Sequence, residues 1–398
     1  MKRYFLLFVF LAFALASFAQ EPGTKRNIYV SAYLDQVEQT VKSGGDAADL
    51  SVRESAKYPQ TPPANDKKPY TKEEESAFLP PDKVPPVVMD NSSGGFHVHS
   101  ILGNVNSSFG FGPTAKTIQG YSTYRIEFIQ DLTGLGLGVN SVPGASELRF
   151  PISGYFGGGQ IAWYAKLKDQ ARHDLIRFTL DWYTHASGSR GHMRDSDWFD
   201  SPLTPGRGIY SESSVNLSGG GLDGRLVYNA LSFGDAVFTG PMLGLKYEKF
   251  QFKCSDLNQI GNGLLAFETM TVAGSDIDYT LKTMIPYLGW SADIFFDDQY
   301  NLQLAGGYSS LADVRDIDNH LLIPKVMRAH CTGSAALVDG KFTWDLDPHW
   351  QLSTTLQYLY ITTSGRQIQT YSDGSQAAAD DQIKSAQFAV DAGLTYRF

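Results

Sequence analysis

The feature that most constrains this chain is an alternation of apolar and polar side chains, with a period of two, that runs to its last residue. Successive side chains of a β-strand point to opposite faces, so this alternation predicts a strand with one apolar face. Such a strand, ending on an aromatic residue, is typical of the closing strand of a transmembrane β-barrel. Its apolar face comprises Ala386, Phe388, Val390, Ala392, Leu394, Tyr396 and Phe398, and its other face comprises Ser385, Gln387, Ala389, Asp391, Gly393, Thr395 and Arg397.

The same alternation recurs upstream, at residues 176–183, 284–294, 301–308 and 351–360. In each segment the apolar set would face lipid and the polar set a wet lumen, and the pattern indicates about ten strands in all. A soluble sandwich would have no need of an apolar outer face. We therefore predict an all-β fold, a transmembrane antiparallel β-barrel of about ten strands with long extracellular loops.

The connections between strands are expected to alternate in length, because barrels of this class place short turns on the periplasmic side and long loops outside. Both acidic motifs described below would then lie on extracellular connections. Short turns are predicted near 169–174, 231–237, 297–300 and 345–349, and long connections near 129–145, 188–220, 255–277, 315–325 and 364–382.

Composition narrows the class of protein. The 398 residues include 39 glycines and 13% aromatic side chains, and they carry a formal net charge of -9. After the first twenty residues there is no apolar run of about 20 residues, which excludes a helical membrane protein. The acidic balance argues against nucleic acid as the main partner. The two cysteines, Cys254 and Cys331, fit either a disulfide, which persists in exported proteins, or two free buried thiols.

The beginning of the chain has the pattern of an export signal. Two basic residues precede an apolar run at residues 4–16, which is too short for a membrane-spanning helix. Small residues follow at Ser17 and Ala19, as they do before a cleavage site. We interpret residues 1–19 as a secretory signal peptide.

A second segment, residues 20–95, is rich in Pro, Lys, Glu, Asp and Ser and offers few apolar side chains to bury. Such a composition predicts a flexible leader. The barrel would then occupy residues 96–398, and export followed by barrel formation predicts the outer membrane of a Gram-negative-type bacterium as its location.

Two acidic motifs stand out in a chain that otherwise uses charge sparingly. GHMRDSDWFDS places Asp195 and Asp197 two residues apart, and RDIDNH places Asp316, Asp318 and His320 at the same spacing. Residues i and i+2 of an extended chain point the same way, about 6.5 to 7 Å apart. Carboxylates that face a histidine can polarise a water between them, because the imidazole accepts the proton while a carboxylate orients it. The motifs therefore permit hydrolytic chemistry.

Other interpretations of these motifs stay open. Acidic loops are commonly just solvated, and several carboxylates can hold calcium, although His320 would be a poor ligand for it. The hydrolytic interpretation also makes a structural demand. Counted at strict period two from Leu302 and Leu304, Asp316 falls on the lipid-facing side. A β-bulge between Tyr308 and Asp316 is therefore required, and bulges gather at barrel rims and beside active sites.

The motifs resemble two segments of the omptins, outer-membrane endoproteases of Gram-negative bacteria. GHMRDSDWFDS is similar to the family pattern Gly-x-Met-x-Asp-x-Asp-Trp-x-Asp-Ser, and DIDNH to Asp-x-Asp-x-His. MIPYLGW at 284–290 resembles an omptin strand of the form Met-Pro-Tyr-Ile-Gly, and AGLTYRF resembles the last strand. Order and spacing agree from about residue 120 to 398. The resemblance implies a ten-stranded barrel with a protease site in an outward-facing groove.

The resemblance also assigns roles to the motif residues. Asp195 and Asp197 match one catalytic aspartate couple of the family, and Asp318 and His320 match the opposing pair. The nucleophile it implies is a water held between the two pairs.

For the substrate pocket, Asp316 matches an acidic residue at the floor of a pocket for a basic side chain, and Met193 matches a methionine that lines it. The first strand departs from the family. It carries Tyr124 where the family supplies a glutamate to this pocket, with Glu127 a few positions away. From Asp316 we therefore expect peptides to be cleaved near basic residues.

A further departure concerns the strand with which the family contacts lipopolysaccharide. Leu245 and Tyr247 stand where the family pattern has tyrosine and glutamate, and Lys249 keeps the basic position. Outer-membrane lipid is the expected surrounding, with lipopolysaccharide as one candidate partner.

The sequence thus predicts an omptin-like aspartic-type endopeptidase that acts on peptides or proteins from outside the cell, without metal or organic cofactor. The alternative is a barrel of the same fold that has lost activity and serves as an adhesin or binding platform. A general porin is disfavoured because about ten strands leave little room for an aqueous channel.

Overall fold

The computed structural model describes residues 96–98, 105–131, 141–167, 174–187, 191–199 and 207–398. The predicted signal peptide and leader lie outside these residues. No helix in the described part of the chain is long and apolar enough to cross a membrane. The elements are β1 (Phe96–Val98), β2 (Val105–Asp131), β3 (Ser141–Leu167), β4 (Ile176–Ser187), β5 (His192–Phe199), β6 (Arg207–Tyr228), β7 (Leu231–Phe233), β8 (Val237–Gly261), the 3-10 helix η5 (Gly263–Glu268), β9 (Met270–Phe295), β10 (Tyr300–His320), β11 (Lys325–Asp345), β12 (Trp350–Tyr371) and β13 (Gln376–Arg397).

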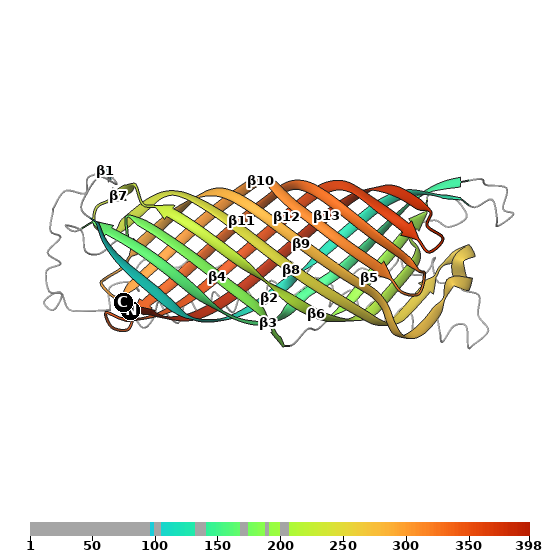
Figure 1. Ribbon diagram of the computed structural model, residues 1–398, viewed down its shortest axis with the longest axis horizontal. Coiled ribbons are helices and arrows are strands. Elements are labelled where there is room, and N and C mark those ends of the chain that lie inside the picture. The colour runs from blue at the N-terminus through green and yellow to red at the C-terminus, as the bar shows by residue number, and fades with distance from the viewer. Residues whose placement is uncertain (1–95, 99–104, 132–140, 168–173, 188–190, 200–206) are drawn as a thin grey trace, which may run out of the picture. The chain divides into compact units, whose positions relative to one another are not determined.

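The strands form one antiparallel sheet that closes on itself (Figure 1). Strands β8 to β13 pair in chain order, β13 pairs with β2 and β2 with β3. Both β4 and β5 pair with β3 and with β6, so they share one position in the ring, and β6 returns to β8. The short strands β1 and β7 pair with each other, and β7 pairs with the start of β8. In the described residues the ring therefore has ten positions, as predicted.

Large apolar side chains cover the outer face of the barrel. They stand on every second residue, and the residues between them point into the lumen, because the side chains of a strand alternate. This confirms the lipid-facing sets predicted from the sequence. Exposed members include Phe109, Phe111, Ile161, Phe178, Leu243, Leu288, Trp290, Leu304, Tyr308, Val338, Tyr358 and Leu394.

Charged side chains replace the apolar ones near the end of the barrel that carries the β10–β11 and β12–β13 turns. Exposed Lys249 and Arg315 follow the outward apolar residues of β8 and β10 along the chain. On β9 and β13, which run in the opposite direction, exposed Lys282 and Lys384 precede them. A strand crosses a bilayer with about 9 to 11 residues. The strand portions beyond these charges therefore project from the membrane, and we call this end the extracellular end.

The strands are longer than the sequence suggested, so the predicted boundaries of several long connections were wrong. β10 runs to His320 and β12 to Tyr371, and only residues 321–324 and 372–375 separate them from the next strands. Beyond the membrane the outer face is polar, so the strand continues without an apolar alternation. The same correction applies to much of the connections expected at 188–220, 255–277, 315–325 and 364–382.

The required β-bulge is present on β10. The register with β11 shifts between Ser309 and Ala312, and the register with β9 shifts between Tyr308 and Asp313. Leu311 points outward there, and the side chains of Asp316 and Asp318 are buried on the inner side. The bulge therefore turns the acidic motif of β10 into the lumen, as the hydrolytic interpretation of the sequence requires.

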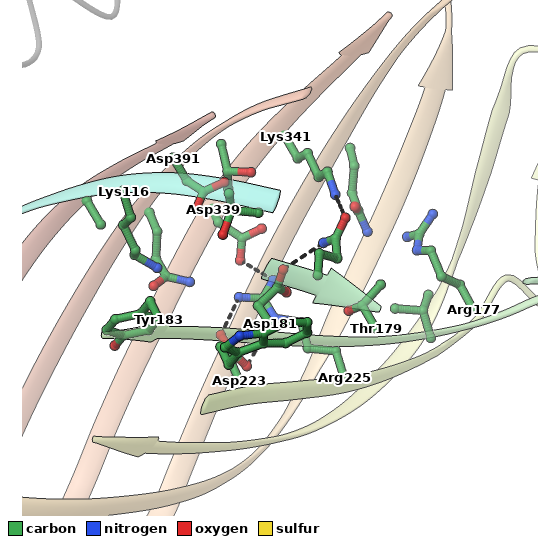
Figure 2. A pocket seen from close by; sticks show the side chains of 18 residues that line it. Lys116, Arg177, Thr179, Asp181, Tyr183, Asp223, Arg225, Asp339, Lys341 and Asp391 are labelled. Carbon is green, nitrogen blue, oxygen red and sulfur yellow. Dashed lines mark hydrogen bonds and ion pairs between the residues drawn. The ribbon is translucent and has the colours of Figure 1, made fainter. Parts of the chain in front are cut away.

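Charged side chains of both signs fill the lumen at the level of the membrane (Figure 2). Arg225 contacts Asp223 at 2.9 Å and Asp339 at 2.7 Å, and Arg177 contacts Asp293 at 3.0 Å. Arg177, Asp223, Arg225 and Asp339 border a cavity of about 60 Å³, which has room for a few waters. This part of the lumen is a packed ionic network.

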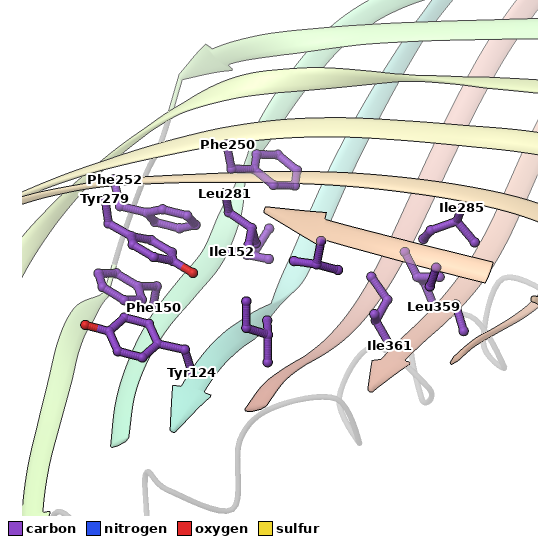
Figure 3. Close-up of a cluster of buried hydrophobic side chains, with 14 of the residues drawn as sticks. Tyr124, Phe150, Ile152, Phe250, Phe252, Tyr279, Leu281, Ile285, Leu359 and Ile361 are labelled. Atoms are coloured by element: carbon purple, nitrogen blue, oxygen red, sulfur yellow. The ribbon is translucent and has the colours of Figure 1, made fainter. Parts of the chain in front are cut away.

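An apolar layer lies in the lumen between this network and the extracellular end (Figure 3). The rings of Phe150 on β3 and Tyr279 on β9 stack with centroids 4.1 Å apart, and Phe252 lies 5.2 Å from Phe150. Because β3 and β9 stand on different walls of the ring, these contacts cross the lumen. The layer divides the polar interior into two compartments.

Both cysteines belong to this apolar layer. Cys254 on β8 and Cys331 on β11 are buried and free. Of the two alternatives weighed from the sequence, free buried thiols is the one that the structure shows.

Candidate functional site

The first acidic motif lies on strand β5, on the extracellular side of the apolar layer. β5 restarts the wall after β4 at Gly191, whose φ of 134° is in the region that favours glycine, and a Cβ there would lie 2.9 Å from Pro151. The strand then points Met193, Asp195 and Asp197 inward, since they alternate with residues that face outward. The motif thus sits on a strand wall rather than in the loop predicted for it.

The second acidic motif lies at the end of β10. The bulge directs Asp316 and Asp318 inward, and both are buried, while His320 at the strand's last position is partly exposed. His320 pairs in register with Lys325, the first residue of β11. This motif also lies beyond the membrane-spanning segment, because it follows the exposed Arg315 on the same strand.

The two motifs act on each other across the lumen. Burial, and then the charge of Asp197, raise the pKa of Asp195 well above its usual range, and the charge of Asp318 adds to this shift. Burial also raises the pKa of Asp197, while nearby His320 opposes the shift. Such mutual effects require short separations, because charge interactions fall with distance. The barrel therefore brings together the four residues expected to be catalytic.

Asp318 is the most constrained of these groups. It is fully buried, and its Oδ2 accepts a hydrogen bond from the hydroxyl of Tyr124 on β2. The same oxygen lies 3.2 Å from Nε2 of His320. Burial and the charge of Asp318 raise the pKa of Tyr124 well above its usual range, so this hydroxyl keeps its proton. Asp318 is thereby held in place to orient the imidazole.

Two further residues affect the pKa of the Asp195–Asp197 couple, and the sequence did not indicate them. The hydroxyl of Ser146 on β3 donates to Oδ1 of Asp195 at 3.2 Å, and it also lowers the pKa of Asp197. The positive charge of Lys325 lowers the pKa of both aspartates. Neither residue belongs to a motif, and only the barrel's register places them here.

The residues expected to line a substrate pocket lie just below. Oδ1 of Asp316 accepts the backbone N–H of Ala329 at 2.9 Å, and Oδ2 accepts the hydroxyl of Tyr279 at 3.2 Å. Burial, and then the charges of Asp381 and Asp318, raise the pKa of Asp316 to about 8. Met193 is fully buried in the apolar layer. The carboxyl is thus fixed by hydrogen bonds and held partly neutral.

With these groups the site can hold a water and move protons. An imidazole oriented by a carboxylate can accept a proton from water, and a carboxyl with a raised pKa can donate one near neutral pH. Among the described residues, no three His, Cys, Asp or Glu side chains are grouped as ligands of a metal ion would be.

Comparison with known proteins agrees with the fold. The outer membrane protease OmpT from Escherichia coli aligns with 16% identity over 73% of this chain and 97% of its own, with a TM-score of 0.60. OprG from Pseudomonas aeruginosa aligns with 12% identity over 74% of this chain and 98% of its own, but with a TM-score of only 0.29. No curated protein matches the sequence.

A family profile gives the assignment that structure alone does not. The profile described as Omptin family matches residues 160–398, which is more than half of the chain and includes both acidic motifs. The molecule is accordingly a β-barrel of the Gram-negative outer membrane. The chain belongs to the Omptin family.

Proposed function

We propose that this barrel is an endopeptidase that hydrolyses peptides or proteins arriving from outside the cell. The observation that carries the proposal is the meeting of the Asp195–Asp197 couple with the Asp318–His320 pair at the extracellular end of the lumen. Membership in a family of proteases supports it. The apolar layer beneath the site supports it further, because a crossed lumen suits a surface reaction better than passage of solutes.

In this mechanism the water lies between the two pairs. His320 accepts a proton from the water as it attacks the substrate carbonyl, and Asp318 stabilises the imidazolium that forms. The hydroxyl of Tyr124 keeps Asp318 in the orientation that the imidazole needs. General base catalysis of this kind contributes about 10² to 10⁴ in rate.

The aspartate couple supplies the second proton function. Because the pKa of each carboxyl is raised, Asp195 and Asp197 keep a proton at pH values where an ordinary aspartate has lost it. The couple can therefore hold the water with one oxygen and donate a proton to the oxyanion or the leaving amine. Ser146 and Lys325 limit the shift, so the couple still ionises.

The substrate side is proposed more broadly. Asp316 and Met193 would line the pocket next to the reacting bond, with a preference near basic residues. Outer-membrane lipid surrounds the barrel, and the exposed Lys249 is available to a phosphate group of lipopolysaccharide. No step of the mechanism requires a metal ion or an organic cofactor.

The test is cleavage of a peptide library by folded protein, read by mass spectrometry. We expect Asp195→Asn, Asp197→Asn, Asp318→Asn and His320→Ala each to lower kcat/KM by about 10² to 10⁴. The control is His330→Ala. His330 is exposed on the outer face, with its Nε2 2.6 Å from Oδ2 of Asp313, so this variant should cleave the library as the parent does.

Two outcomes would contradict the proposal. If the four variants cleave the library like the parent, these residues do not perform the reaction. If the parent cleaves nothing while cells that carry it bind extracellular proteins, the inactive binding barrel replaces the protease.

A further inference from the structure

Lys325, the first residue of β11, faces the lumen beside the candidate site. The inward residues of this strand, Met327, Ala329 and Cys331, are buried and alternate with exposed ones, so Lys325 belongs to the inner set. Its partner in register on β10 is His320, which lies on the same face. Directly paired residues of antiparallel strands have Cβ atoms about 4.5 to 5.5 Å apart. The amino group of Lys325 is therefore within reach of a group that binds at the imidazole of His320.

Hydrogen bonds hold the short turn that joins β10 to β11. The backbone N–H of Leu321 donates to the carbonyl of Asp276 on β9 at 2.8 Å. On the other side, the backbone N–H of Ser372 in the β12–β13 turn donates to the carbonyl of Pro324 at 3.1 Å. The turn is thus fixed by both neighbours, which sets the position of Lys325 relative to the imidazole.

No described side chain forms an ion pair or a hydrogen bond with Lys325. Its register partner on β12 is Tyr371, whose hydroxyl donates to Oε1 of Gln369 at 3.1 Å instead. The charge of Lys325 nevertheless acts across the lumen, because it opposes the rise in the pKa of both Asp195 and Asp197 on β5. The ammonium group therefore faces the site and is available to bind negative charge that develops on a substrate.

We propose that Lys325 is a catalytic residue, whose ammonium group donates a hydrogen bond to the oxyanion that forms on the carbonyl of the cleaved peptide bond. It rests on the proposed protease function and adds a residue to that mechanism. Donors and charges stabilise an oxyanion most when they are already directed at the point where the charge develops. A lysine offers three donors and a full positive charge there.

The step balances with the groups already in the site. As the oxygen of the water bonds to the carbonyl carbon, His320 takes a proton from the water. The π electrons of the carbonyl move onto its oxygen, which Lys325 stabilises. When the C–N bond breaks, these electrons restore the carbonyl, and the leaving nitrogen keeps the bonding pair and takes the proton of the Asp195–Asp197 couple. His320 then returns its proton to the couple, and Lys325 keeps its protons throughout.

The first experiment measures kcat and KM of Lys325→Met across pH, with folded full-length protein in lipid vesicles and one peptide that the parent cleaves. We expect kcat at the optimum to fall by about 10² to 10³, as for loss of one oxyanion donor, while KM changes less than about twofold. Lys325→Arg keeps a charge and N–H donors, so it should recover about tenfold or more of this loss. The matched control is Lys384→Met, which removes an exposed lysine from the outer face of β13 and should keep the parent's values.

A second experiment requires no turnover. A phosphinic peptide of the same sequence has a tetrahedral centre with a negatively charged oxygen, so it resembles the intermediate rather than the substrate. Its dissociation constant, measured by fluorescence anisotropy of a labelled peptide, should rise about 10²-fold in Lys325→Met. The value for Lys384→Met should equal that of the parent.

The outcomes separate the role of Lys325 from the proposed function. If Lys325 only adjusts the pKa of the aspartate couple, Lys325→Met moves the pH profile of kcat to higher pH and regains the parent's kcat at the new optimum. That result overturns the oxyanion role and leaves the protease standing, and an unchanged affinity for the phosphinic peptide overturns it as well. A parent that cleaves no peptide removes the protease and the role of Lys325 together.

Discussion

The lumen of this barrel buries acids at two levels, the lower one within the membrane and the upper one at the extracellular end, and the Arg ion pairs lie at the lower level. At the membrane level Asp223 and Asp339 share Arg225, and Asp293 binds Arg177. At the extracellular end none of Asp195, Asp197, Asp316 and Asp381 forms an ion pair with a described residue. Buried carboxylates are therefore ion-paired at the membrane level, whereas these four at the extracellular end are not paired with a described residue.

This difference separates packing from function. Buried charges are costly unless they are paired, so the ion-paired network at the membrane level, which we call the lower network, is what we expect where charged side chains pack a narrow lumen. The four aspartates at the extracellular end are instead what we expect of a site that binds water and substrate. Proteins keep such unfavourable buried groups chiefly at functional sites. The apolar layer between the compartments keeps the two apart.

The largest effect on stability is expected from the lower network. Arg225→Met leaves two buried carboxylates without their shared guanidinium and should lower the free energy of unfolding by about 3 to 5 kcal/mol. Chemical unfolding in lipid or detergent measures it. The control is Arg315→Met, which breaks an exposed pair with Asp313 and should cost about 0 to 1 kcal/mol. Equal losses for the two variants would contradict the comparison.

The upper compartment should respond in the opposite direction. Because burial raises the pKa of Asp381 to about 7, folding favours its protonated form. That contribution to stability is complete below the unfolded pKa of about 4 and is lost as the pH rises through about 7. Asp381→Asn, which cannot ionise, should therefore be more stable than the parent at pH 8, by about 1 to 3 kcal/mol.

The measurement is chemical unfolding of Asp381→Asn and the parent at pH 4 and pH 8. The gain in the free energy of unfolding of Asp381→Asn should shrink toward the lower pH. The control Asp380→Asn, which changes the exposed neighbour of Asp381, should follow the parent at both pH values. A loss of stability in Asp381→Asn at pH 8 would show that its carboxylate has a favourable partner and would place it with the lower network.

Local patterns in the sequence predicted much of the barrel. Apolar alternation identified the lipid-facing strands, and the parity of Asp316 against Leu302 required the bulge that β10 contains. The strand ends could not be predicted this way, because beyond the membrane both faces are polar. His320 therefore seemed to lie in a loop, although β10 extends to it.

Contacts across the lumen were harder to predict from the sequence. The sequence marked Tyr124 as a departure from the family pattern but not as the donor to Asp318, which lies 194 residues away along the chain. Ser146 and Asp381 carry no motif at all. Their places depend on the register and tilt of the whole ring, which no local pattern encodes.

The smallest of these effects tests whether one kind of bond has different roles in the two compartments. Tyr124 donates to buried Asp318 in the upper compartment, and Tyr183 donates to buried Glu248 at 2.5 Å in the lower one. Tyr124→Phe should lower kcat about tenfold, because a hydrogen bond to a charged group is worth about 1.5 to 3 kcal/mol. Tyr183→Phe removes the same atom and should leave kcat unchanged.

The pH dependence of kcat shows whether Tyr124 acts through Asp318. Without the hydrogen bond from Tyr124, the negative charge of Asp318 acts more strongly on His320 and favours the protonated imidazole. The acidic limb of the pH profile of kcat should therefore move to higher pH. Tyr183→Phe should instead show only a lower free energy of unfolding with an unchanged profile. A Tyr124→Phe protein with a lower kcat but the parent's profile would show that the hydroxyl only packs the wall, and a shifted profile in Tyr183→Phe would show that the apolar layer does not insulate the site from the charges beneath it.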